Sequence, residues 1–216
     1  MSVRFDSAAD RLLRTTDLLN YANPYTWMGF VQLVSDLNNY QTFLTINNNG
    51  ITGEDYFGTG VDGVTLVAYV YSNGAPTEVA GSVLTVGVWY HIAVVRESTT
   101  SAKVYLNGVL DVTNTRDIAA GSGRAANTRV EVGGEFSTNG SRLNGRVSAQ
   151  KAWSVGLTAA EVANEVRSIR PRIFANLYGW WPNFPGTTER LRDYSGNGRN
   201  WTEVGTLTDE SSPPVS

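Results

Sequence analysis

The 216-residue sequence contains no cysteine and a single histidine, His91. The lack of cysteine excludes disulfides, thiolate metal ligands and a nucleophilic thiol. One histidine is too few for a histidine-based zinc site. His91 lies between Tyr90 and Ile92, in a segment that reads as a β-strand. We therefore expect a packed core side chain there, rather than the base of a Ser-His-Asp triad.

Charge is also scarce. Charged residues make up 17% of the chain and the formal net charge is −3, whereas soluble domains typically contain about 25%. Without clustered Lys and Arg, the sequence offers no support for nucleic-acid binding. No apolar stretch approaches the roughly 18 residues that span a bilayer, so we expect no membrane insertion.

The first residues lack a basic segment followed by an apolar one, so we expect no signal peptide. We expect synthesis in the cytoplasm and action on a virion or an extracellular surface.

The sequence is rich in short β-forming runs separated by Gly and Asn. They span residues 25–34, 41–46, 64–71, 89–96, 103–106, 109–113, 129–132 and 145–153. Between two of them stands Asn107-Gly108, a strong hairpin signal, because both central residues of a type I′ turn need positive φ. The pattern predicts an all-β fold, a two-sheet antiparallel jelly-roll sandwich, over residues 1–207.

Residues 208–216 are polar and contain two prolines. They predict either a solvated tail or an arm that pairs with a neighbouring subunit.

One helix is expected near residues 159–168. Thr158 and Glu161 have the spacing of a capping box. Val162 and Val166 then recur at helical spacing, and Pro171 ends the segment.

Several segments together resemble one family. They are Trp89–Arg96 with the Asn107-Gly108 hairpin, the run 145–153 followed by Leu157–Val162, and Asp193-Tyr-Ser-Gly-Asn-Gly-Arg-Asn200. This combination resembles the laminin-G-like and concanavalin A-like lectin jelly-roll domains, which implies a binding or structural module.

The resemblance has two departures. Many members of the family place the Tyr-Trp strand and the Asp-x-Ser-Gly-Asn-Gly loop near the N-terminus, but here both follow the helix. We therefore predict a permuted order, with a strand near 178–183 antiparallel to 145–153. Ser148-Ala149 also stands where the family often carries Asp-Glu.

The sequence lacks a catalytic carboxylate pair. Glucanases of this superfamily carry a Glu-x-Asp-x-Glu type strand, and retaining hydrolysis needs two carboxyls about 5–5.5 Å apart. Glu54 and Asp55 are adjacent, so on a strand they face opposite ways. Glu131 and Glu135 bracket two glycines. We expect no enzyme activity, and glycoside hydrolysis is the less favoured alternative.

The loop 193–200 is the candidate ion site. Asp193, Asn197 and Asn200 can offer side-chain oxygens to calcium. The resemblance implies that Asp193 helps to hold the ion, and Asp6 and Asp10, which resemble a stretch of the family, are further candidate ligands. An Asx-type turn without metal remains the alternative, because Asp and Asn readily bond their own backbone.

Candidate glycan contacts combine a loop aromatic with polar neighbours. They are Tyr40 with Asn39, and Tyr56 with Asp55. Sugar rings stack on exposed aromatic faces, but for each tyrosine taken alone an ordinary loop anchor is the favoured interpretation.

Two functions remain open. The first is a non-catalytic carbohydrate-binding or adhesion module, displayed on a surface such as a phage particle. The second is a structural virion protein, a head decoration or tail-associated subunit without glycan binding. The expected partners are a glycan or surface polysaccharide, capsid or tail proteins, and further copies of the chain, since weak lectin sites gain from multivalency.

Overall fold

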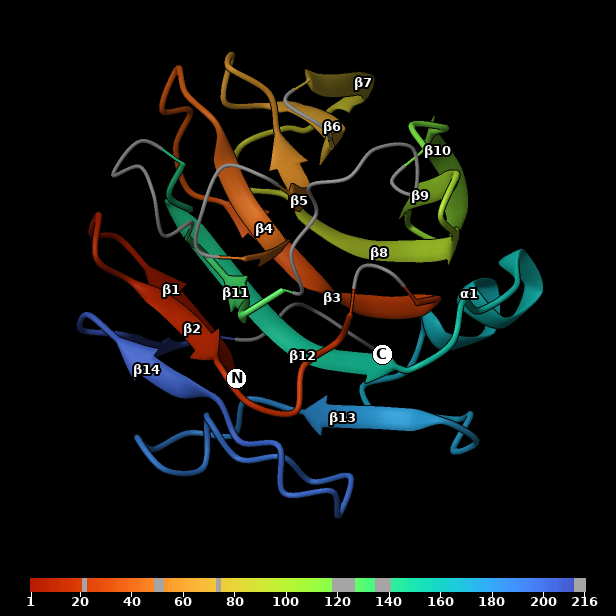
Figure 1. Ribbon diagram of the computed structural model, residues 1–216. Coiled ribbons are helices and arrows are strands. Elements are labelled where there is room, and N and C mark those ends of the chain that lie inside the picture. Colours follow the sequence, from red (N-terminus) through yellow and green to blue (C-terminus); the bar gives the residue numbers. More distant parts are fainter. Residues whose placement is uncertain (21–22, 49–52, 73–74, 118–126, 135–140, 212–216) are drawn as a thin grey trace.

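The computed structural model describes residues 1–20, 23–48, 53–72, 75–117, 127–134 and 141–211. Two antiparallel sheets pack face to face, with one short helix against the outside of the first, which confirms the predicted all-β sandwich (Figure 1). Within the described ranges, no helix has the length and apolar character needed to cross a bilayer.

The first sheet, sheet A, has eight strands. In spatial order they are β10 (Val109–Asn114), β9 (Ser101–Leu106), β8 (Trp89–Ser98), β3 (Tyr25–Leu33), β12 (Gly145–Trp153), β1 (Ser2–Phe5) and β15 (Thr208–Glu210), with β13 (Leu177–Trp181) also paired to β12.

The second sheet, sheet B, has seven strands. In spatial order they are β14 (Thr202–Val204), β2 (Arg11–Arg14), β11 (Arg129–Val132), β4 (Gln41–Asn47), β5 (Gly53–Thr59), β6 (Thr65–Ser72) and β7 (Ala75–Val83).

Two apolar clusters explain the layers. Trp27, Val94 and Phe57 belong to the main cluster between the sheets. A smaller cluster on the outer face of sheet A includes Trp153 of β12 and Val162 of α1 (Ala159–Glu165). Because successive strand residues face opposite ways, the same central strands supply both clusters.

The predicted hairpin and capping box are both present. Asn107 has φ 52° and Gly108 has φ 85°, as a type I′ turn requires. The Thr158 side chain accepts from the Glu161 backbone, and the Glu161 carboxylate accepts from the Thr158 backbone. The helix is shorter than predicted and ends at Glu165.

The predicted pairing of the strand that follows the helix is confirmed. β13 runs antiparallel to the second half of β12, from Gln150 opposite Trp181 to Trp153 opposite Leu177. β1 pairs with the first half of β12, from Val3 opposite Val147 to Phe5 opposite Gly145. Between the two halves lies a bulge at Ala149, whose φ is 51°.

The predicted domain boundary at residue 207 needs correction. Residues 208–210 form β15, which pairs with β1 in the same chain, Ser2 opposite Glu210. Residues 208–210 are therefore neither a solvated tail nor an arm that needs a neighbouring subunit, because their strand partner lies in the same chain. Residues 212–216 of the predicted tail lie outside the described residues.

Candidate carbohydrate-binding surface

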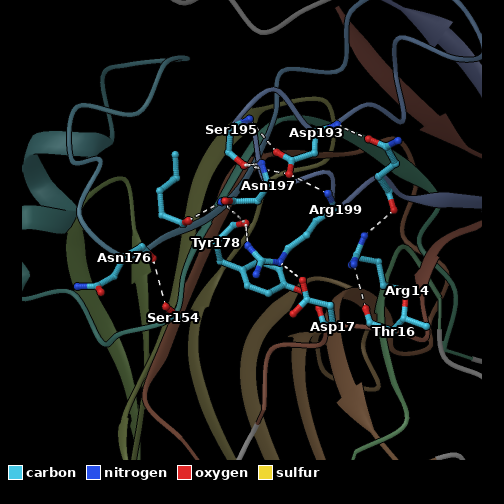
Figure 2. Close-up of polar contacts among 12 residues, drawn as sticks. Arg14, Thr16, Asp17, Ser154, Asn176, Tyr178, Asp193, Ser195, Asn197 and Arg199 are labelled. Atoms are coloured by element: carbon cyan, nitrogen blue, oxygen red, sulfur yellow. Dashed lines mark hydrogen bonds and ion pairs between the residues drawn. The ribbon is translucent and has the colours of Figure 1, made fainter.

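The loop that follows β13 is organised around the Asp193 carboxylate (Figure 2). Its Oδ1 accepts from the backbone N–H groups of Trp180 (3.0 Å) and Ser195 (2.8 Å). Its Oδ2 accepts from the Ser195 hydroxyl (2.9 Å) and the Arg199 backbone N–H (2.9 Å). Four donors therefore occupy this carboxylate, and one of them ties the loop to β13.

The two asparagines of the loop are exposed, but their side chains also bond protein partners. The Asn197 Nδ2 donates to the carbonyl oxygens of Leu177 (2.9 Å) and Tyr178 (3.2 Å). The Asn200 Oδ1 accepts from the Asp193 backbone N–H at 2.9 Å. Both amides thus close the turn.

The N-terminal acids form a second turn of the same kind. The Asp10 carboxylate accepts from the backbone N–H groups of Asp6 (3.0 Å), Ser7 (2.9 Å) and Thr206 (2.9 Å), and from the Ser7 hydroxyl (2.8 Å). The Asp6 side chain is exposed.

The side-chain oxygens of these two turns do not fit a calcium ion. Calcium takes six to eight oxygen ligands, but the oxygens of Asp193 and Asn200 already accept hydrogen bonds, and Asn197 presents its amide nitrogen to carbonyls. Across the described ranges, no group of three or more His, Cys, Asp or Glu side chains is gathered for a metal. The geometry favours the Asx-type turn.

Two of the predicted glycan contacts are buried, so their assignment as ligand residues was wrong. Asp55 is 0% exposed and lies between the sheets, because strand alternation turns it inward. Its carboxylate pairs with the Arg96 guanidinium (Nε to Oδ2, 3.2 Å) and accepts from the Tyr25 hydroxyl (3.0 Å).

Tyr56 faces the other way but is also buried, at 3% exposed. It lies between the rings of Tyr40 (centroids 5.8 Å apart) and Tyr69 (6.1 Å), and its hydroxyl donates to the Thr59 carbonyl.

The other predicted pair remains at the surface. Tyr40 is half-buried, and its hydroxyl donates to Glu78 at 3.0 Å. Asn39 is half-buried, and its Oδ1 accepts from the Tyr40 backbone N–H. Tyr40 is therefore anchored on the outside of sheet B.

The lone histidine is buried, as predicted. His91 is 2% exposed, and its ring packs edge-on to Phe30. Burial, together with the positive charge of Lys151, lowers its pKa to about 3. A neutral, enclosed imidazole with so low a pKa is unsuited to act as a general base near neutral pH.

The acids considered for catalysis are not available as a pair. Glu131 is 0% exposed and forms ion pairs with Arg11 (3.1 Å) and Arg129 (3.6 Å). Glu135 lies outside the described residues.

A surface feature that the sequence reasoning missed is an aromatic strip formed by Trp180, Tyr194 and Phe184. The Tyr194 ring lies 6.0 Å from Trp180 and 5.1 Å from Phe184, centroid to centroid. Phe184 is 43% exposed and the other two rings are half-buried. The guanidinium of Arg192 lies 5.2 Å from the Tyr194 ring centroid.

The sequence held a signal for this strip. Trp180 and Trp181 are adjacent on β13, and neighbouring strand residues face opposite sides of a sheet. Only one of them can enter the main core, and Trp181 does so, at 1% exposed. Trp180 is therefore directed to the outside, where the loop of Asp193 brings Tyr194 against it.

The comparisons with known proteins agree with the fold. The family described as the concanavalin A-like lectin/glucanases superfamily matches residues 6–163, and the chain belongs to it. No curated protein matches the chain.

Three solved structures show the same architecture. A protein from Bacteroides ovatus ATCC 8483, provisionally described as carbohydrate binding, is 18% identical with a TM-score of 0.69, over 98% of this chain and 60% of that one. A Trypanosoma rangeli sialidase in complex with sialic acid is 11% identical with a TM-score of 0.60, over 76% and 27%. The binding domain of Paraclostridial Mosquitocidal Protein 1 is 15% identical with a TM-score of 0.51, over 69% and 38%.

The chain thus spans 60% of the first of these proteins and smaller shares of the others. At such identities the likeness concerns the fold alone.

Proposed function

We propose that this protein is a non-catalytic carbohydrate-binding module that mediates adhesion at a surface. The observation that carries the proposal is the aromatic strip of Trp180, Tyr194 and Phe184, on a domain of the concanavalin A-like superfamily. Aromatic rings offer apolar faces to the C–H groups of a sugar, and polar neighbours serve its hydroxyls.

The strip is held in place before any ligand arrives. The Trp180 Nε1 donates to the Ile169 carbonyl at 3.0 Å, and the Tyr194 hydroxyl donates to Glu189. The backbone N–H of Trp180 is fixed by Asp193. Little side-chain freedom is lost on binding, which favours affinity.

The polar side chains around the strip suit hydroxyl recognition. The Arg192 side chain is 57% exposed and that of Glu189 41% exposed, and they approach each other at 3.6 Å. Such an exposed pair contributes little to stability, so both groups can exchange their contact for hydroxyls of a bound sugar.

The buried state of the ionisable groups supports a role without catalysis. Asp55, Glu131 and Glu165 are all 0% exposed and engaged by cationic side chains. A retaining glycosidase needs two carboxyls facing one solvent-accessible bond. The sialidase likeness extends only to the fold.

We further propose that the module is displayed in several copies on a particle such as a phage, beside capsid or tail proteins. The low charge content of 17% supports an exposed coat, and several weak sites on one particle raise the overall avidity.

The test is a glycan-array screen of the purified protein, followed by titration of the best glycan against Phe184→Ala and Phe174→Ala. Phe174 is 72% exposed and lies outside the strip, so it is the matched control. We expect Phe184→Ala to weaken binding about tenfold and Phe174→Ala to leave it unchanged.

The array is run with calcium and with chelator. Equal binding in both is expected, because the Asp193 carboxylate is already satisfied. Loss of binding under chelation would overturn the metal-free turn. An absence of binding in both conditions would contradict the proposal and favour a structural particle subunit, to be tested by assembly on the particle.

A further inference from the structure

A cavity lies between α1 and the turn that joins β9 to β10. Its volume is about 360 Å³, within the size range of small-ligand sites. One wall is the β9–β10 turn, Asn107 to Val109. The other wall is α1 and the segment after it, with Asn164, Arg167 and Arg172 as its polar side chains.

The charged groups that line this cavity are both cations. Arg167 and Arg172 belong to the sequence Arg167-Ser-Ile-Arg-Pro-Arg172. Neither forms an ion pair with the part of the chain that the structure describes. The Arg172 Nη1 donates to the Asn164 Oδ1 at 3.2 Å, which leaves most of its donors unused.

The carboxylate of Glu165, next to Asn164 on α1, is engaged by other groups. The Glu165 Oε2 pairs with the Lys151 Nζ at 2.6 Å, and both side chains are 0% exposed. The Glu165 Oε1 accepts from the backbone N–H groups of Arg172 (2.6 Å) and Ile173 (2.8 Å). The arginines are therefore not neutralised by it.

The same buried pair fixes the backbone that carries the arginines. The Lys151 Nζ also donates to the carbonyl oxygens of Glu165 (2.9 Å) and Ser168 (2.7 Å). The segment is thus held at its start by Lys151 and at its end by Glu165. A site built on a fixed backbone loses less entropy on binding than one on a free loop.

One contribution opposes an anion here. The cavity lies at the C-terminal end of α1, where the helix dipole places partial negative charge. Lys151 offsets it, because its ammonium group bonds the last helical carbonyl directly. The net field in the cavity is therefore set by the two arginines.

The opposite wall supplies a neutral donor. The Asn107 Oδ1 accepts from the His91 backbone N–H at 2.9 Å, which fixes the amide. The NH₂ group of Asn107 takes no part in that bond and is the donor offered to a ligand in the cavity. A Cβ at Gly108 would lie 3.4 Å from Val166 Cγ1, in ordinary van der Waals contact, so the turn lies against the helix.

We propose that this cavity binds the anionic group of an acidic glycan, a carboxylate or a sulfate ester, through Arg167, Arg172 and Asn107. This inference rests on the proposed function and assigns its ligand class. Planar guanidinium forks match carboxylate and sulfate oxygens, and charge-assisted hydrogen bonds are the stronger kind. The aromatic strip is a separate contact for neutral sugar rings.

The experiment measures binding of sialyllactose and of a sulfated chondroitin oligosaccharide, with lactose as the neutral probe. The variants are Arg167→Gln, Arg172→Gln and the matched control Arg170→Gln, which removes the same charge from a residue outside the cavity lining. We expect the first two to weaken binding of the acidic probes about tenfold. The control should change it less than about twofold, as expected for a screened surface charge.

The outcomes separate this inference from the proposed function. If Arg170→Gln weakens acidic binding as much as Arg167→Gln, attraction is unspecific and the inference is overturned. If neutral glycans bind through the strip and acidic ones bind no tighter, the inference fails while the proposed function stands.

A final arm does not depend on glycan recognition. Free glucuronate and inorganic sulfate are titrated into the protein, and the backbone amide signals of Asn107 and Gly108 are followed by NMR. Saturable shifts that Arg167→Gln abolishes support the cavity even when no array glycan binds. Shifts absent in wild type overturn it.

Discussion

At the scale of single residues, the sequence around Asp193 and Asp10 is compatible with metal binding, but in the structure these carboxylates hold turns together. Asp193 and Asp10 each collect four donors, mostly backbone N–H groups. The sequence could name these acids but not their partners, because Trp180 and Thr206 are supplied by segments distant along the chain. For the same reason it could not show that Asp55 is buried against Arg96.

His91 makes the stability depend on pH. Its pKa is lowered to about 3 in the folded protein, against about 6.5 in an unfolded chain. Between these values only the unfolded state takes up the proton, so stability falls as pH falls from about 6.5 towards 3.

We expect the free energy of unfolding of wild type, relative to a His91→Leu variant, to drop by about 2–3 kcal/mol from pH 7 to pH 4.5. Urea denaturation at both pH values measures it. The variant serves as the control, since it keeps every carboxylate. Parallel pH profiles for the two proteins would show that His91 titrates normally in the fold.

At the scale of elements, β12 explains much of what the sequence could and could not predict. The apolar runs of β3 and β8 made those strands evident, and β12 was predicted with them although it mixes polar and apolar residues. The shortest strands were harder to predict, because β1, β14 and β15 have only three or four residues and owe their strand form to a partner rather than to composition. The pairing of β13 was predictable only through the family resemblance.

The helix is joined to β12 by the buried Lys151–Glu165 pair. Lys151→Met leaves the Glu165 carboxylate buried without its cation, and we expect a loss of about 3–5 kcal/mol in the free energy of unfolding. The double variant Lys151→Met/Glu165→Gln keeps an oxygen acceptor for the amides of Arg172 and Ile173 and should recover most of that loss.

Guanidinium denaturation of the two variants and wild type measures both effects. Equal destabilisation by the single and the double variant would contradict an uncompensated charge as the cause.

At the scale of the whole molecule, both sheets depend on the last quarter of the chain. The family match ends at residue 163, yet β13 and β15 belong to sheet A and β14 to sheet B. Tyr178, Trp181 and Trp201 from this region are part of the main core.

A chain shortened to residues 1–170 should therefore lose cooperative folding. Removing these aromatic side chains from the core leaves a void and an exposed apolar edge on β12. We expect no sharp thermal transition by circular dichroism and rapid cleavage in limited proteolysis, with the full chain as the control. A cooperative melt near the full-chain temperature would show that the matched region suffices.

The pairing of β1 with β15 determines how such a domain can be joined to other polypeptides. Ser2 and Glu210 are opposed across one ladder, and opposed antiparallel residues have Cα atoms about 4.5–5.5 Å apart. That gap is the reach of one or two residues. If the domain were inserted into a surface loop of a host protein, its two connections would lie close together. The loop ends of the host would then need little displacement to accept it.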